Sequence, residues 1–258
     1  MYNPSRGYKE EGLPKINVYL PDDLATAVRA ADIPVSAICQ KALADAVQTV
    51  QKSRKAIAAL RDPRFDPDAH PQFAIRLANR MTPRLRQALA LARDASNGTE
   101  HVSTPDLLIG ILDEHGNMAV RLLQALGQDL DVLREAAQQL DADEPLPGTR
   151  PDQTAEPSVW SGLTLPSRIA IGAALEASID LGHNYLGCEH LLLGLLEDPD
   201  SGAGQVLRGA GLDKAGVRRS ITSAVAGFEQ ARQAGPVAQD QLMQRLDAIE
   251  HRLTTAGF

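Results

Sequence analysis

The chain has 258 residues, of which 43% are hydrophobic and only 3% aromatic, so its core must consist mainly of Leu, Ile, Val and Ala. This length accommodates one large domain or two small ones, and the composition favours packed helices over β-sandwiches. No stretch approaches the roughly 18 consecutive apolar residues of a membrane-spanning helix, so no membrane partner is expected. Residues 1–12 are polar, and Cys39 and Cys188 fit no metal-ligand spacing; we expect a cytoplasmic protein with reduced thiols.

The net charge of −7 is unevenly distributed along the chain. Residues 1–80 carry 12 Lys and Arg against 9 Asp and Glu, a net charge of +3, which leaves −10 for the remainder. A mildly basic N-terminal part on an acidic body suggests that the two parts bind different partners.

The N-terminal part predicts one strand followed by two helices. Residues 15–20 alternate polar and apolar side chains, which is the period of a half-buried strand. Pro21 ends this strand, and the two aspartates that follow favour the start of a first helix. After a turn at residues 32–34, Ser36 is expected to cap a second helix that continues to Leu60.

One short strand and two helices cannot bury their own apolar faces, so residues 1–60 are predicted to form a homodimer through an antiparallel two-stranded ribbon. This order of elements resembles the ribbon-helix-helix modules of the Arc and MetJ class, which insert the ribbon into the major groove of double-stranded DNA. The resemblance implies an operator as partner, with Ile16, Val18 and Leu20 facing the dimer core. A head that only dimerises the chain is the alternative. The residues predicted to contact DNA are Lys15, Asn17 and Tyr19 on the ribbon and Val35 and Ser36 at the start of the second helix.

Two linkers and a tail are expected. Residues 61–77 and residues 141–163 contain several prolines each, which predicts stiff connecting segments. Trp160 in the second linker is expected to anchor it on the domain, and a place in a ligand groove is the alternative. The tail, residues 227–258, predicts a short coiled-coil-like helix, because apolar residues recur in it with 4-3-4 spacing at Leu242, Leu246, Ile249 and Leu253.

An internal repeat occupies most of the remaining chain. A shift of 84 residues aligns residues 81–137 with residues 165–221 without a gap. Each copy, residues 81–140 and 165–225, predicts four helices, so the chain should be mainly α with an eight-helix domain. Matching glycines are expected to allow close helix contact or to end helices in the left-handed conformation. They are Gly110 and Gly194 inside the second helix of each copy, and Gly127 and Gly211 after the third.

The repeats carry a family resemblance. The second copy reads L-G-H-N-Y-L-G-C-E-H-L-L-L-G-L-L at residues 181–196 and closely resembles the N-terminal double repeat of the Clp unfoldases of the ClpC and ClpA kind. The first copy is similar at residues 82–89 and 101–112, and the resemblance covers residues 78–226. In that family the domain is a receptor for substrates and adaptors ahead of the ATPase rings. The chain lacks the G-x-x-x-x-G-K-[ST] phosphate loop, so it resembles a free-standing receptor domain without its motor.

The resemblance also implies ligand sites. In ClpC-like domains, the Glu of the G-T-E-H stretch helps to bind the guanidinium of phosphorylated arginine, and Glu189 in G-C-E-H keeps this position. The first copy has Pro105 there, with Asp106 following as a helix cap. Met81 and Leu165 take the positions of aromatic residues that line the family's groove for peptide antibiotics. The candidate ligand-binding residues are therefore Met81, Arg84, Asp106, Leu165, Arg168 and Glu189.

Other combinations of residues do not indicate chemistry. His183 and His190 are seven residues apart without further metal ligands at helical spacing, so structural hydrogen bonds are expected. No nucleophile motif is present, and we expect neither a catalytic site nor a cofactor. The sequence thus predicts a non-enzymatic, homodimeric, DNA-binding protein that captures peptides, arginine-phosphorylated proteins or cyclic peptide antibiotics directed at ClpC. The alternative is an adaptor or decoy of the Clp unfoldase and protease in which the head only dimerises.

Overall fold

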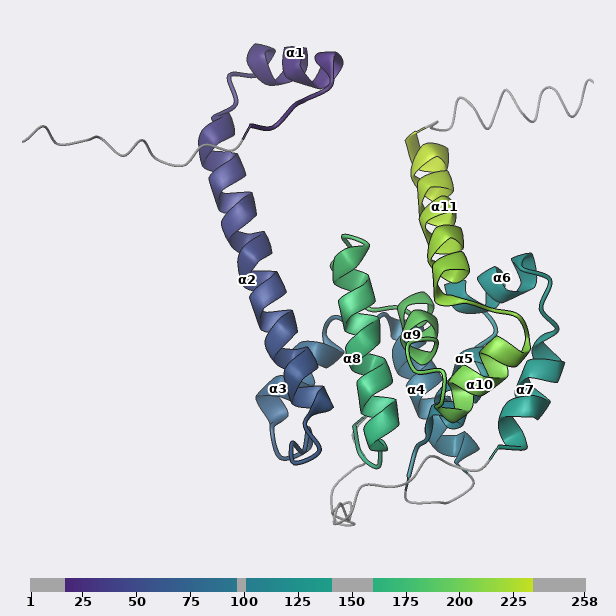
Figure 1. The fold of residues 1–258 in the computed structure, drawn as a ribbon. Coiled ribbons are helices and arrows are strands. Elements are labelled where there is room, and N and C mark those ends of the chain that lie inside the picture. Colours follow the sequence, from purple (N-terminus) through teal and green to yellow (C-terminus); the bar gives the residue numbers. More distant parts are fainter. Residues whose placement is uncertain (1–16, 97–100, 141–159, 234–258) are drawn as a thin grey trace, which may run out of the picture. The chain divides into compact units, whose positions relative to one another are not determined.

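The computed structural model describes residues 17–96, 101–140 and 160–233, and these segments contain eleven helices and no strand (Figure 1). The chain divides into two compact units, Met1–Thr49 and Val50–Phe258. None of the helices in the described segments is both long enough and apolar enough to cross a membrane.

The first unit contains the two helices expected for the head. Helix α1, Asp22–Ala30, begins directly after Pro21 with two aspartates in its first turn, where they interact favourably with the helix dipole. Helix α2, Val35–Arg61, begins here and ends in the second unit. Ser36 is the second residue of α2 and not its cap, because Pro34 already lies at the helix boundary.

The predicted strand at residues 15–20 is not confirmed. Residues 17–20 form neither a helix nor a strand in the single chain, and Lys15 and Ile16 lie outside the described residues. Val18 is 63% exposed and lacks the partner strand that a ribbon requires. The exposed apolar side chains of this unit are Val18, Tyr19, Leu20, Leu24, Ile33, Val35, Ile38, Leu43 and Val47.

The segment predicted as a linker, residues 61–77, instead contains most of helix α3, Pro71–Ala78, which belongs to the second unit and contributes Leu77 to its core. Pro71 occupies the first turn of α3, where proline is well tolerated, so one of the prolines begins a helix. Leu77 is buried, and the ring of Phe73 lies 6.2 Å from that of Trp160. Trp160 itself is 3% exposed, which confirms its prediction as an anchor.

The eight helices predicted for the repeats are present. In the first copy they are α4, Pro83–Ala95, α5, Thr104–Asp113, α6, Met118–Ala125, and α7, Leu130–Gln138. In the second copy they are α8, Leu165–Asp180, α9, Cys188–Leu195, α10, Gly202–Gly209, and α11, Lys214–Gln233. The two copies differ most in their last helix, because α11 is longer than α7 and extends into the segment predicted as the tail. The predicted coiled-coil residues lie outside the described segments.

The glycines pack and turn as predicted. A Cβ atom added to Gly194 would collide with the carbonyl oxygen of Ala170, and one added to Gly110 would collide with that of Ala88. Each glycine therefore lets the second helix of its copy lie directly on the backbone of the first helix. Gly127 and Gly211 have φ of 76° and 77° at the ends of α6 and α10.

These contacts correct the register of the repeat. The first helices are capped by Thr82 and Thr164, which lie 82 residues apart, whereas α5 and α9 begin 84 residues apart. The second copy therefore has two more residues between its first cap and its second helix, and the ungapped alignment is wrong for the first helix. Arg168 corresponds to Arg86, not to Arg84. Likewise, Met81 corresponds to Leu163 and not to Leu165.

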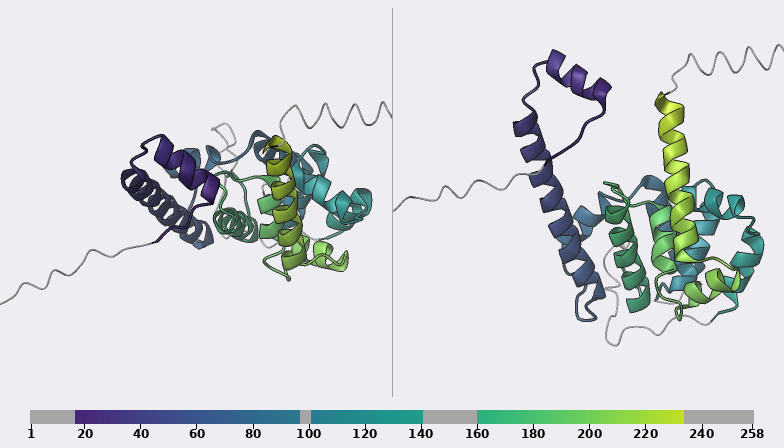
Figure 2. Two further views of the ribbon diagram at one scale, coloured as in Figure 1. Left: turned by 90° about the horizontal axis from the view of Figure 1, so that it is seen from above. Right: turned by 45° about the horizontal axis from the view of Figure 1, so that its top comes forward.

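Helix α8 is covered on two sides. It packs against α9, and the last turns of α2 lie on its other side (Figures 1 and 2). A Cβ atom added to Gly172, in the middle of α8, would lie 3.7 Å from the Cβ of Leu60 in α2. Ten of its sixteen residues are buried, and the exposed residues Glu176 and Asp180 share one face. The last turns of α2, with Ile57 and Leu60 buried, thus belong to the core of the second unit.

Candidate ligand and DNA sites

The two copies interlock at two junctions. At junction A, the start of α4 pairs with the segment before α9 through a bridge between Met81 and Leu186. At junction B, the start of α8 pairs with the segment before α5 through a bridge between Leu163 and Val102. Met81 and Leu163 are 3% and 7% exposed, so these two apolar residues are buried in the junctions and line no open groove.

Junction A contains Glu189, the second residue of α9. Its side chain is 8% exposed, and burial raises its pKa. Tyr185 is hydrogen-bonded to this carboxylate, and burial together with the charge of Glu189 raises the pKa of the phenol to about 12. The phenol is therefore a donor at neutral pH.

Two histidines hold the backbone of this junction. The backbone N–H of Gly187 donates to Nδ1 of His190 over 3.0 Å, so the neutral His190 donates through Nε2 to Nδ1 of His183, 2.8 Å away. Burial, followed by the charges of His183 and Arg80, lowers the pKa of His190 to about 3. The prediction of structural hydrogen bonds is confirmed.

Glu189 joins these two histidines in a cluster that sequence spacing did not indicate. One ligand atom from each of the three residues lies within 4.8 Å of the others. However, Nδ1 of His190 already accepts a backbone N–H, and its Nε2 must carry the proton in the neutral ring. His190 thus has no lone pair free for a metal ion in this arrangement.

Junction A also contains an ion pair that sequence reasoning missed. Nη1 of Arg84 lies 2.7 Å from Oε1 of Glu114, whose side chain is 3% exposed. Cys188, at the first position of α9, is 1% exposed, and its pKa is raised by burial and by the charges of Glu189 and Glu114. Both cysteines are free thiols, as expected. In the sequence, the only signal for this pair is the position of Glu114 directly after the second helix of the first copy, α5.

At junction B, the predicted ligand residue Asp106 caps a helix. Oδ2 of Asp106 accepts the backbone N–H and the hydroxyl of Ser103 over 2.8 and 2.7 Å, which forms a capping box at the start of α5. Pro105 lies in the first turn of the helix, and Leu165 is half-buried. The helix-capping role expected for Asp106 accounts for its side chain.

Arg168 donates its hydrogen bonds to backbone carbonyls outside the two junctions. It is 2% exposed, and its guanidinium donates to the backbone carbonyls of Asp62 and Phe65, which lie between α2 and α3. Desolvation lowers its pKa, although the charges of Asp66 and Asp62 act in the opposite direction. Arg168 therefore fastens the segment before α3 to α8, and the structure does not bring it to the predicted ligand site.

The described residues predicted to contact DNA are accessible. Tyr19 is 93% exposed, Asn17 is exposed, and Val35 and Ser36 are exposed at the start of α2. Lys15 lies outside the described residues.

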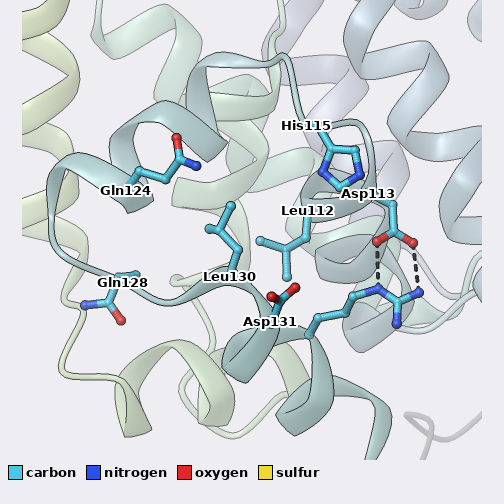
Figure 3. Close-up of a pocket in the computed structure, with 8 residues that line it drawn as sticks. Leu112, Asp113, His115, Gln124, Gln128, Leu130 and Asp131 are labelled. Carbon is cyan, nitrogen blue, oxygen red and sulfur yellow. Dashed lines mark hydrogen bonds and ion pairs between the residues drawn. The ribbon is translucent and has the colours of Figure 1, made fainter.

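A separate pocket of about 290 Å³ lies in the first copy. Leu112 and Leu130 lie between two glutamines on one side and His115 on the other (Figure 3). The bidentate ion pair of Asp113 with Arg134 forms part of its wall. None of the predicted ligand-binding residues lines this pocket.

Comparison with known proteins identifies the repeats. The family described as the Clp repeat (R) N-terminal domain matches residues 80–158 and 162–252. The chain belongs to this family. The two matches begin 82 residues apart, in agreement with the corrected register of the first helices. The family of the post-segregation antitoxin CcdA matches residues 14–59, the segment that contains α1 and most of α2.

Several relatives share the repeat domain. An uncharacterized protein of Mycobacterium tuberculosis is 35% identical over 154 residues, which is 59% of this chain and 56% of the relative. A probable ATP-dependent Clp protease ATP-binding subunit of Chlamydia pneumoniae is 32% identical over 58% of this chain and 17% of its own length. The negative regulator of genetic competence ClpC/MecB of Bacillus subtilis is 26% identical over 68% and 21%. The chain thus matches only about half of the mycobacterial relative and about a fifth of the other two proteins.

Among solved structures, the N-terminal domain of the chaperone ClpD from Arabidopsis thaliana is similar. It matches with a TM-score of 0.44 and 23% identity over 57% of this chain and 96% of the domain.

Proposed function

We propose that this chain is a cytoplasmic, non-enzymatic receptor that is coupled to a dimeric DNA-binding head. In this proposal the Clp repeat domain captures peptides, arginine-phosphorylated proteins or cyclic peptide antibiotics directed at ClpC. The head binds an operator.

Glu189 carries the receptor part of the proposal. It is the carboxylate of the G-C-E-H stretch, and it lies at junction A with a tyrosine hydroxyl as its only side-chain donor among the described residues. A guanidinium presents two parallel N–H donors to a carboxylate and is therefore a stronger partner than a phenol. At junction B, Pro105 and the capping role of Asp106 leave no equivalent group. We therefore assign one ligand site to each chain.

Calorimetry with a phosphoarginine peptide tests this assignment. Glu189→Gln keeps the size of the side chain and removes its charge, and should cost roughly 1.5–3 kcal/mol of binding energy, or about 10–100-fold in affinity. Asp106→Asn is the matched control at junction B and should leave the affinity unchanged. Absence of binding to the parent protein would reject the ligand, and equal losses in both variants would reject the site.

The head part rests on the exposed apolar row and on the antitoxin match. Val18 and Leu20 are 63% and 39% exposed, and pairing of two ribbons would bury both. The same pairing directs Asn17 and Tyr19 outward, where an amide can bind a base edge in the major groove. The match of residues 14–59 to the CcdA family supports a separate module at this end of the chain.

A mobility-shift assay on the DNA upstream of the protein's own gene tests the head. If the dimer neutralises about six phosphates, the slope of log K against log salt should be near −5. Asn17→Ala should cost roughly 1–3 kcal/mol at the cognate site and little elsewhere. If no band is retarded at low salt, the head only dimerises the chain.

That negative result would favour the second candidate, an adaptor or decoy of the Clp machinery. Its support is the similarity of the repeat domain to the N-terminal part of Clp ATP-binding subunits. Co-purification of a Clp unfoldase with the full chain, without any DNA retardation, is the outcome expected of an adaptor.

A further inference from the structure

Glu114 is a buried carboxylate that is only half satisfied. It follows α5, its side chain is 3% exposed, and its Oε1 accepts one N–H from Arg84 over 2.7 Å. Its Oε2 is buried and has no hydrogen-bond partner among the described residues. A buried charged group that lacks a partner is costly, so such an atom calls for an explanation.

The preceding residue shows what full pairing looks like in the same turn. Asp113 receives two N–H groups from Arg134, over 2.7 and 3.1 Å, one on each oxygen. This is the fork-to-fork geometry that makes an arginine–carboxylate pair strong and specific. Arg84 supplies one nitrogen to Glu114 and leaves the second acceptor empty, although it has the same side chain as Arg134.

Arg84 is also the accessible member of its pair. Its side chain is 55% exposed, while that of Glu114 is 3% exposed, so Arg84 covers the carboxylate from the solvent side. The guanidinium lies against Gly116, where an added Cβ would collide with Nη1. The charges of Glu114 and Glu189 both act on Cys188 at the start of α9, which places the pair beside the proposed ligand site.

We propose that Glu114 anchors a second subsite, for an unmodified arginine side chain of a bound polypeptide, and that Arg84 occupies this subsite in the free chain. The incoming guanidinium displaces Arg84 and donates to both oxygens of Glu114. The released Arg84 extends into solvent, where its charge is hydrated. This inference rests on the proposed receptor function and makes basic, arginine-containing polypeptides its preferred ligands.

Fluorescence anisotropy with a labelled pentapeptide, glycine with a central arginine, tests the subsite on the full chain. The same peptide with citrulline, which is neutral and of equal shape, is the ligand control. Glu114→Gln should weaken binding of the arginine peptide about tenfold or more, because a charged acceptor is lost. Asp113→Asn removes an equal charge one residue away and should leave the affinity unchanged.

Two further variants separate a ligand subsite from a purely structural ion pair. Arg84→Ala should raise the affinity for the arginine peptide about tenfold, because it removes the internal competitor. Gly116→Ala keeps every charge and should lower the affinity, because its methyl group fills the space of the guanidinium. A structural pair predicts no change in affinity for either variant, and that result in folded protein would overturn the subsite. Circular dichroism establishes that each variant is folded. If Arg84→Ala does not fold, the affinity of Gly116→Ala alone tests the subsite.

The phosphoarginine peptide distinguishes this inference from the proposed function. Glu189→Gln should weaken its binding about 10–100-fold, and the arginine peptide should still bind through Glu114. If the phosphoarginine peptide binds but the arginine peptide binds no better than the citrulline peptide, the subsite is overturned and the receptor function is retained. Failure of both peptides overturns the receptor function as well.

Discussion

Gly194 tests how closely the helices of the repeats pack. In an exposed helix, replacing glycine by alanine stabilises the protein by about 1 kcal/mol, because the unfolded chain loses freedom. In α9 the new methyl group would meet the carbonyl oxygen of Ala170 and, at 2.9 Å, the backbone nitrogen of Ala174. Backbone atoms of a buried helix cannot give way as a flexible side chain can, and overpacking of this kind costs about 1–3 kcal/mol or more.

We therefore expect Gly194→Ala to destabilise the chain by about 2 kcal/mol, which lowers the melting temperature by roughly 4–8 °C for a unit of this size. Thermal unfolding followed by circular dichroism measures this change. Gly209→Ala is the matched control, since Gly209 ends α10 and its added Cβ has no neighbour within 4 Å. Its melting temperature should stay constant or rise. A Gly194→Ala protein as stable as the parent would refute the close contact of α8 with α9.

Three other predictions follow from the contacts of this chain. Arg168→Met should cost about 3 kcal/mol of stability, measured by urea unfolding, because the carbonyls of Asp62 and Phe65 lose a charged donor. As the pH falls from 6.5 towards 3, the unfolded state takes up a proton that the buried His190, with its pKa of about 3, refuses, so stability should fall over this range. His190→Asn should remove that part of the decrease. Deletion of residues 1–20 removes the proposed ribbon and leaves α1 and α2, so it should convert the proposed dimer to a monomer in light scattering; a persistent dimer would exclude the ribbon as the interface.

The repeat was the most predictable part of the fold, because its glycines are needed for specific backbone contacts. Gly110 and Gly194 cannot be replaced without moving a helix, so they recur at a fixed spacing that a sequence comparison detects. The register of the first helix was less predictable. Arg84 and Arg168 match only by chance, because they are 84 residues apart, which is the spacing of the second helices. The correct spacing of the first helices is 82 residues, as shown by the caps Thr82 and Thr164 and by Ala88 and Ala170, which contact Gly110 and Gly194.

The head and the site were predictable to different degrees. Both helices of the head follow from local signals, but the strand predicted from the alternating pattern is not confirmed, because a short strand requires a partner strand. Glu189 was found because its motif is intact, whereas its burial beneath Tyr185 depends on tertiary packing. Glu114 has no motif at all. Its significance lies in an unsatisfied oxygen, and this can be seen only when its neighbours are placed.

The two copies of the repeat place their arginines differently because their first helices have different neighbours. Helix α8 is covered by α9 on one side and by the last turns of α2 on the other, so most of its residues are buried and Arg168 turns inward to the carbonyls before α3. Arg84, near the start of α4, is 55% exposed and holds Glu114 instead. The same helix order therefore gives one copy an accessible arginine and the other a structural one. Ile57 and Leu60 contribute to this cover, so a truncation meant to remove only the head must end at Thr49. A chain that begins after residue 60 would expose the buried face of α8, and loss of ligand binding in such a chain would report damage to the receptor and not a role of the head.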